Sequence, residues 1–212
     1  MKKYAIIVAG GKGTRMSVET PKQFLMVKGK PVLVHTIERF LEIANVEVVL
    51  VLPKEHHHTW EQIKVIHFPS MDIVSVTGGA SRTDSVKAGL ACLNEDGLVA
   101  IHDAVRPFIT KSVIQKCYSS AEEFGSGVAA VQLKDSLRRI VSKGISQARE
   151  RQNYVLVQTP QTFRTKEIKE AYLKTSGQFP DDATVYEKAG FQVRIVEGAY
   201  SNIKITTQED LK

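Results

Sequence analysis

Residues 4–25 read YAIIVAGGKGTRMSVETPKQFL, an apolar stretch that leads into a glycine-rich, cationic segment. The run 4–9 is continuously apolar and contains three β-branched residues, which is typical of a central strand buried on both faces of a parallel sheet. The glycines of the GGKG segment allow positive φ and carry no Cβ, so successive backbone N–H groups can close around an anion such as a polyphosphate. Arg15 and Lys22 add two positive charges. The stretch therefore predicts a strand followed by an anion-binding loop.

Two well-known phosphate-binding loops do not fit this segment. A Walker A loop requires Gly-Lys followed by Ser or Thr, but Lys12 is followed by Gly13. A dinucleotide-binding fingerprint requires a third small residue where Met16 stands. The second predicted strand, 46–52, also ends in Pro-Lys and not in the carboxylate that would bind a ribose. The glycine loop is therefore of another kind.

The composition indicates one globular domain over residues 1–212, because 42% hydrophobic and 25% charged residues are ordinary proportions for a chain that buries one core. No run approaches the roughly 18 apolar residues of a membrane span. Residues 1–3 lead directly into the first strand without a signal-peptide pattern, so we expect a cytoplasmic protein without membrane association. Cys92 and Cys117 lack metal-ligand spacing and are expected to be free thiols.

The net charge of +6 raises the question of nucleic-acid binding. Lys and Arg are dispersed along the chain, however, and no basic block alternates with aromatic residues. Small anionic substrates explain the excess charge better, so we expect no nucleic-acid partner. The run His56-His57-His58 could suggest a metal site, but consecutive side chains point apart and no fourth ligand is near in sequence.

Apolar runs and helical periods alternate along the rest of the chain. Further strands are expected at 46–52, 73–77, 98–102, 127–133, 154–157 and 192–197. Helices are expected at 31–44, 54–67, 82–93, 113–124, 166–173 and 181–189, with a last helix beginning at 208. This alternation predicts an α/β fold, a three-layer sandwich around a Rossmann-like, mostly parallel sheet.

Two more segments resemble ligand-binding loops. Residues 78–82, GGASR, form a second glycine loop, and Ser81 with Asp84 makes a capping box for the helix that follows. The strand at 98–102 ends in HDAVRP, which places Asp103 and Arg106 at its carboxyl end. The loops after the first, third and fourth strands all leave the carboxyl edge of the sheet, so we expect them to face a single crevice.

The segment 134–153 is polar and irregular, with short alternating pieces and a turn near Lys143-Gly144. This pattern predicts a protruding β-hairpin arm outside the main core. Because an isolated two-stranded arm is marginal in water, we expect it to form a dimerisation subdomain that packs on another subunit. The alternative is a surface hairpin without a partner.

The order and spacing of the motifs resembles the 2-C-methyl-D-erythritol 4-phosphate cytidylyltransferase family. The resemblance runs nearly end to end and rests on GGKGTRM with PKQF, GGASRTDSV, IHDAVRPF, KDSL, QTPQTF, DDATVYEKAG and NIKIT with DL. It implies the fold of the nucleotide-diphospho-sugar transferases. It also implies transfer of a cytidylyl group from CTP to 2-C-methyl-D-erythritol 4-phosphate, with release of pyrophosphate, in non-mevalonate isoprenoid precursor synthesis.

The resemblance also implies roles for individual residues. The nucleotide would be held by Ala9, Gly10, Gly11, Gly13, Gly79, Ala80, Ser85 and Asp103. The polyol phosphate would be surrounded by Ala104, Arg106, Thr159 and Lys204. In the family the arm crosses a dimer interface, so Ser136 and Arg151 would contribute to the partner's substrate site in a homodimer.

The implied chemistry suits these residues. The attacking phosphate oxygen is already an anion near pH 7, so no general base is required. The reaction needs positive charge around the α-phosphorus and a divalent cation on the phosphate oxygens. Arg15, Lys22 and Lys204 would be the catalytic cations. Asp103 would help to hold Mg²⁺, which prefers one or two carboxylates together with phosphates and water.

The sequence departs from the family pattern at three places. Pro180 stands where many relatives carry a hydroxyl residue, Ser136 replaces a commoner threonine, and the chain ends at Lys212, before most of the usual final helix. Two other functions stay open: a cytidylyltransferase that acts on ribitol 5-phosphate, and a nucleotide-binding regulatory protein without catalysis. The regulatory reading predicts loss of a charged site residue, whereas all of them are present.

Overall fold

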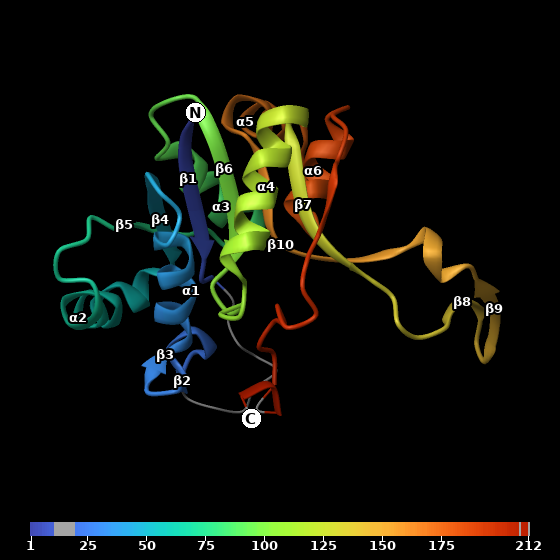
Figure 1. Ribbon diagram of the computed structural model, residues 1–212, viewed down its shortest axis with the longest axis horizontal. Coiled ribbons are helices and arrows are strands. Elements are labelled where there is room, and N and C mark those ends of the chain that lie inside the picture. Colours follow the sequence, from blue (N-terminus) through green and yellow to red (C-terminus); the bar gives the residue numbers. More distant parts are fainter. Residues whose placement is uncertain (11–19, 208, 212) are drawn as a thin grey trace.

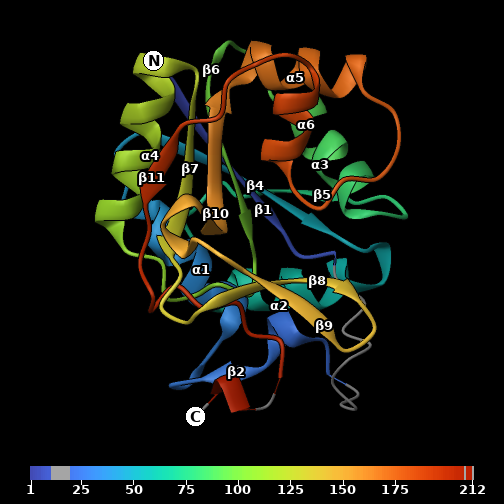
Figure 2. The same cartoon turned by 90° about the vertical axis from the view of Figure 1, so that its right-hand side faces the viewer.

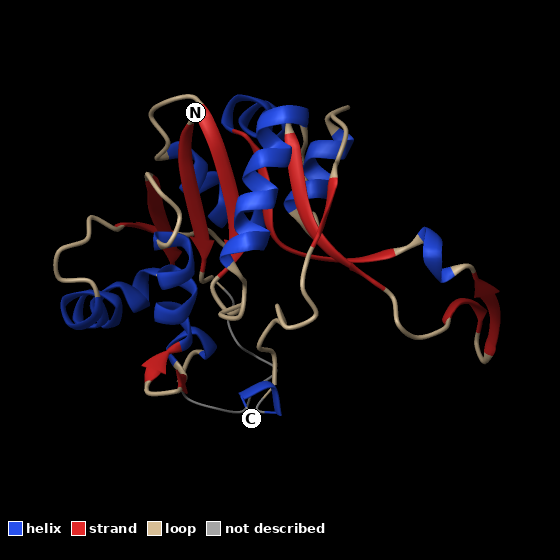
Figure 3. Cartoon of the chain, viewed as in Figure 1, coloured by secondary structure: helices blue, strands red, loops and turns tan. Residues whose placement is uncertain are grey.

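The computed structural model describes residues 1–10, 20–207 and 209–211, and these residues form a central seven-stranded sheet (Figures 1 and 3). Its strands follow the order β11 (Ile195–Glu197), β7 (Ser126–Gln132), β10 (Val155–Arg164), β6 (Gly97–Asp103), β1 (Lys2–Val8), β4 (Val46–Leu52) and β5 (Val74–Thr77). Strand β10 runs antiparallel to both neighbours, and the other neighbouring pairs in this sheet are parallel. The predicted mostly parallel sheet is confirmed.

Helices cover both faces of the sheet (Figure 2). One face carries α1 (Val32–Leu41), α2 (His57–His67) and α4 (Lys111–Phe124), and the other carries α3 (Arg82–Ala91), α5 (Thr165–Lys174) and α6 (Asp182–Lys188). Side chains of β1 alternate between the two apolar cores: Ile7 lies in the first, Ile6 in the second, and both are fully buried. This is the packing expected of a strand covered on both faces, and it confirms the three-layer sandwich.

The helix starts follow the capping signals in the sequence. The capping box between Ser81 and Asp84 opens α3, with both of its hydrogen bonds present. Thr110 and Asp181 cap α4 and α6 by accepting a backbone N–H three residues on. Pro31 was expected inside the first turn of its helix, but it directly precedes α1 with an extended ψ of 142°. The reason is the small hairpin of β2 (Met26–Val27) and β3 (Lys30–Pro31), which requires extended backbone there.

Strand β10 is longer than the predicted strand at 154–157. The polar QTPQTF segment was expected to leave the sheet, yet Gln161 and Thr162 are buried and pair with β6. A register shift between Val157 and Gln161 accommodates Pro160, which has no N–H to offer to the ladder. The predicted strand at 192–197 is reduced to β11, and the last predicted helix begins as the short 3₁₀ turn η4 (Glu209–Leu211).

The predicted arm is present as a separate two-stranded sheet, β8 (Leu137–Ser142) and β9 (Ile145–Arg149), that projects away from the body (Figure 1). Its turn contains Gly144 at a φ of 75°, a conformation that favours glycine. The remaining short elements are the 3₁₀ turns η1 (Lys22–Phe24), η2 (Lys54–His56) and η3 (Arg151–Asn153). In the described part of the chain, every helix is too short or too polar to span a bilayer.

Candidate active site

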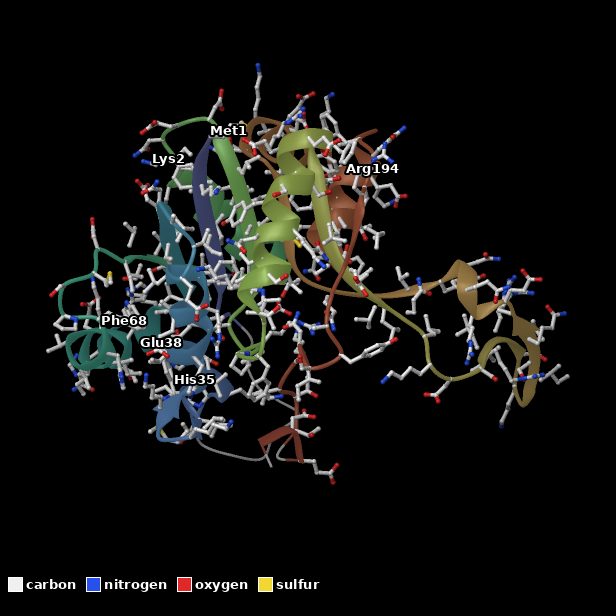
Figure 4. The ribbon with its side chains drawn as sticks, in the orientation of Figure 1. Met1, Lys2, His35, Glu38, Phe68 and Arg194 are labelled. Carbon is white, nitrogen blue, oxygen red and sulfur yellow. The ribbon has the colours of Figure 1, made fainter. Side chains whose placement is uncertain are left out.

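Three cations surround Asp103, the last residue of β6, among the residues that the structure describes. The Lys204 Nζ lies 2.8 Å from Asp103 Oδ2, and the Arg106 Nε lies 3.6 Å from the same oxygen. The Arg82 Nε lies 3.6 Å from Oδ1. These cations come from the C-terminal segment, the loop after β6 and the start of α3. The cluster lies at the carboxyl edge of the sheet, whereas Met1 and Lys2 mark the opposite edge (Figure 4).

The ionisation of Asp103 is set by two opposing effects. Burial of the carboxyl group would raise its pKa, because only 11% of the side chain is exposed. The positive charges of Lys204, Arg82 and Arg106 outweigh this desolvation and lower the pKa to about 2. Asp103 is therefore a carboxylate at neutral pH, and its single negative charge faces three positive ones.

Arg82 was missing from the predicted site residues, and its orientation is fixed by a second carboxylate. Its two terminal nitrogens donate to Asp182 at 3.0 and 2.7 Å, a bidentate arrangement. Asp182 is fully buried and also accepts a hydrogen bond from the Tyr172 hydroxyl at 2.5 Å. The Arg82–Asp182 pair joins the start of α3 to the start of α6. The position of Arg82, directly after the second glycine loop, is the signal that could have identified it.

The PKQ motif lies between the end of β1 and the C-terminal segment. The Lys22 ammonium donates a hydrogen bond to the backbone carbonyl of Thr206, two residues beyond Lys204. The buried Gln23 amide donates to the carbonyl of Ala9 at 3.2 Å. Lys22 is thus brought into the neighbourhood of Lys204, as predicted. The other loop residues that were assigned roles, Gly11, Gly13 and Arg15, lie outside the described residues.

The two glycine loops meet at Ser85. Its hydroxyl accepts a hydrogen bond from the Gly79 N–H at 3.2 Å and donates to the Ser81 carbonyl at 2.9 Å. A Cβ on Gly10 would lie 3.2 Å from the Ser85 Oγ, and a Cβ on Gly79 would lie 2.3 Å from the Asp84 Cβ. Both loops therefore need glycine for close approach. Ala80, also predicted for the nucleotide side, is exposed in the second loop.

Thr159, Ala104 and Arg106 lie beside Asp103 on the β10 side. The Thr159 hydroxyl accepts the Asp103 backbone N–H at 3.1 Å, and Arg106 Nη1 donates to the carbonyl of Asn202 at 2.8 Å. Ala104 is fully buried, with its N–H bonded to the Val8 carbonyl at 3.0 Å. The structure therefore brings together the predicted acceptor residues of the main body.

His102 supports the loop of Asp103 and Arg106 from inside the core. Burial lowers the pKa of its imidazole to about 4, so the ring is neutral at pH 7. The ring lies 5.0 Å from Phe40, and its Nε2 donates to the carbonyl of Arg106 at 3.2 Å. A neutral histidine therefore fixes the turn that follows β6.

Ser136 and Arg151 are not brought to this crevice within one chain. Both residues are exposed on the arm, and Arg151 donates to the carbonyl of Lys134 at the root of the arm. Lys134 in turn lies 3.8 Å from the centre of the Tyr200 ring. The geometry of the arm therefore leaves these two residues available for another molecule.

The donor set around Asp103 fits a magnesium ion that is held mainly by a nucleotide. Among the described residues, no group of three or more His, Cys, Asp or Glu side chains could hold a metal by itself. One ionised carboxylate is what a Mg²⁺ bound through phosphate oxygens requires from the protein. In the histidine run, His56 contacts the Phe24 ring, His57 bonds to Thr77 at 3.2 Å and His58 bonds to Gln62 at 3.3 Å. The three side chains thus have different partners.

Comparison with known proteins identifies the family. The sequence model of the IspD family, described as 2-C-methyl-D-erythritol 4-phosphate cytidylyltransferase, matches residues 4–212. The chain belongs to this family. A relative of that name from Bacteroides thetaiotaomicron is 46% identical over 214 residues, covering 100% of this chain and 97% of the relative. Membership confirms the resemblance seen in the motifs and the class of enzyme, cytidylyltransferase.

Solved structures of the IspD family share the fold. A 4-diphosphocytidyl-2C-methyl-D-erythritol synthase from Anaerococcus prevotii has a TM-score of 0.85 and 30% identity, covering 99% of this chain and 94% of that one. A 2-C-methyl-D-erythritol 4-phosphate cytidylyltransferase from Thermus thermophilus has a TM-score of 0.82 and 29% identity, covering 100% of this chain and 96% of that one. The nucleotidyltransferase-like α/β fold is therefore confirmed.

The lowered pKa of Asp103 predicts how stability depends on pH. A carboxyl group with a lower pKa in the folded than in the unfolded protein stabilises the fold above its unfolded pKa, near 4. That contribution falls as the pH approaches the folded value of about 2. The full contribution is roughly 2 kcal/mol. In Asp103→Asn this part of the pH dependence is lost, as measured by urea unfolding between pH 5 and 3. In Lys204→Met, with two of the cations kept, it becomes smaller. An unchanged slope in Asp103→Asn would contradict the assignment.

Proposed function

We propose that the protein transfers the cytidylyl group of CTP to 2-C-methyl-D-erythritol 4-phosphate. The products are 4-diphosphocytidyl-2-C-methyl-D-erythritol and pyrophosphate, in the non-mevalonate route to isoprenoid precursors. Family membership and the names of the relatives support this activity. The structural observation that supports it best is the cluster of Lys204, Arg106 and Arg82 around Asp103, with Lys22 bonded to the same C-terminal segment.

The chemistry follows from the charges at this edge of the sheet. A phosphate oxygen of the acceptor attacks the α-phosphorus of CTP, a new P–O bond forms, and the bond to the β-phosphate oxygen breaks so that pyrophosphate leaves. The nucleophile is already an anion, so the protein does not need to remove a proton. Its task is to gather and orient two anionic substrates and to stabilise the charge that develops at phosphorus. We assign this stabilisation to Lys22, Lys204 and Arg15.

We assign the two substrates to the two halves of the crevice. The nucleotide lies against the glycine loops, where the close approach of Gly10 and Gly79 to neighbouring side chains leaves backbone groups to face a ligand. The acceptor lies towards Arg106 and Thr159, with Lys204 between the two halves. Asp103 would hold Mg²⁺, which neutralises negative charge on phosphate oxygens when it is bound.

We propose that the arm, 134–153, forms a homodimer interface in a protein whose main body is one domain. The arm and its root expose apolar side chains that a lone chain would leave in water: Ile140 (78% exposed), Ile145 (61%) and Leu156 (55%). A two-stranded ribbon gains stability when it packs on another surface. Arg151 and Ser136 would then reach the substrate site of the partner subunit.

We also propose a cytoplasmic location. The support is chemical: Cys92 and Cys117 are both free, and the thiol of Cys117 is buried. Free thiols without disulfide partners are typical of proteins in reducing compartments.

The activity is tested by pyrophosphate release. Purified protein is incubated with Mg²⁺, one of CTP, ATP, GTP or UTP, and either 2-C-methyl-D-erythritol 4-phosphate or ribitol 5-phosphate. We expect rapid release only with CTP and the methylerythritol phosphate. A faster reaction with ribitol 5-phosphate would replace the proposed acceptor, and binding of CTP without release in any combination would favour the regulatory alternative.

The role of Lys22 is tested by Lys22→Ala. We expect kcat to fall by about 10²- to 10³-fold, because a charge that acts in the transition state is lost. The free energy of unfolding should change by less than about 1 kcal/mol, since this side chain is not part of the apolar core. Lys116→Ala, at an exposed position of α4, is the matched control and should retain normal turnover. Near-normal kcat in Lys22→Ala would refute the assignment.

The shared site is tested by mixing two inactive variants, Arg151→Ala and Lys22→Ala. In a mixed dimer one of the two sites receives both an intact Lys22 and an intact partner arm, so up to about one half of the activity per mixed dimer should return. Differently tagged chains allow the mixed dimers to be isolated before the assay. Dimers that are verified as mixed and stay inactive would count against an arm residue acting in the partner's site.

A further inference from the structure

Asn202 is a fully buried polar residue that joins three parts of the acceptor half of the crevice. Its side-chain Nδ2 donates to the backbone carbonyl of Thr159 at 2.8 Å and to the Gln158 Oε1 at 3.3 Å. Its own backbone carbonyl accepts from the Arg106 guanidinium at 2.8 Å. One residue thus contacts β10, the loop after β6 and, through its own chain, the segment that carries Lys204.

The same segment is anchored on both sides of Lys204. The Ile205 N–H donates to the Val105 carbonyl at 2.9 Å, so Lys204 lies between two fixed points. The Gln158 side chain also holds the start of the segment, because its Nε2 donates to the Ala199 carbonyl at 2.9 Å. The position of the Lys204 ammonium, 2.8 Å from Asp103, therefore depends on where Asn202 is held.

Asn202 is an expensive choice for a purely structural position. Its Oδ1 is buried and has no hydrogen-bond partner among the described residues, and the buried Arg106 Nε has none either. Leaving buried polar atoms unpaired destabilises a fold, and an apolar side chain would fill such a position at lower cost. Where a sequence departs from the most stable choice in this way, function is the usual reason. The directional bonds of the amide are what an apolar residue could not supply.

We propose that Asn202 is a positioning residue for the transfer reaction, which fixes Arg106, Thr159 and Lys204 relative to one another on the acceptor side. This inference rests on the proposed function. Asn202 touches neither glycine loop in any contact described above, so its effect falls on the acceptor phosphate and on the barrier, and spares the binding of the nucleotide. Misplacement of such groups by about 1 Å can cost on the order of 10²-fold in rate.

The test compares Asn202→Ala with Gln158→Met. The first variant removes the amide, and the second removes its side-chain partner together with the bond to Ala199. Tyr200→Phe is the matched control, because it removes a hydrogen bond from the same segment, the one to the Gln132 carbonyl, on the exposed side. For each variant kcat and both KM values are measured, and the Kd of CTP in the absence of acceptor is determined by calorimetry.

For Asn202→Ala we expect kcat/KM for the acceptor to fall by about 10- to 100-fold, while the Kd of CTP changes by less than about threefold. Gln158→Met should show the same split with a smaller loss, and Tyr200→Phe should resemble the wild type. Parallel weakening of CTP binding and acceptor use, or wild-type kinetics in both variants, would overturn the inference. Should Asn202→Ala fail to fold, Gln158→Met decides. An inactive wild-type protein would instead contradict the proposed function, so the two failures are distinguishable.

Discussion

One buried carboxylate holds together a cluster of positive charges that would otherwise repel each other. Asp103 receives Lys204, Arg82 and Arg106 from three distant parts of the chain, and their combined charge keeps it ionised although it is buried. The cluster has a surplus of positive charge, because one carboxylate faces three cations and Asp182 balances only Arg82. In a partly desolvated crevice this surplus attracts anionic ligands more strongly than it would in bulk water. A site for two phosphate-bearing substrates is the natural use of such a cluster.

The sheet explains why these residues meet. Strands β1 and β6 are parallel neighbours with Val8 opposite Asp103, so the first glycine loop and the acidic end of β6 emerge side by side. Strand β10 enters from the opposite direction, and its register shift places Thr159 against the Asp103 backbone. A wholly parallel sheet would have put a strand end there. The antiparallel strand instead supplies a side wall, to which the C-terminal segment is tied through Asn202.

Much of this could be predicted from the sequence. Apolar runs, glycine loops and capping signals gave the element order, the layers and the edge at which the ligands would gather. The extent of β10 could not be predicted, because QTPQTF is polar and contains a proline, and only long-range pairing with β6 makes it a strand. Arg82 and Asn202 stand inside recognised motifs, yet their importance depends on contacts with residues about 100 and 40 positions away. Local sequence patterns contain no record of such contacts.

The ends of the sheet have a consequence for the behaviour of the protein in a crowded solution. Strand β5, with four residues, and strand β11, with three, form the two edges, whereas the inner strands have seven or ten residues. Short edges offer an approaching molecule few open backbone groups, so the sheet is a poor template for fibre-like polymerisation. Association by strand pairing is thereby discouraged at the main body, and the protruding ribbon can specialise in recognising its own kind.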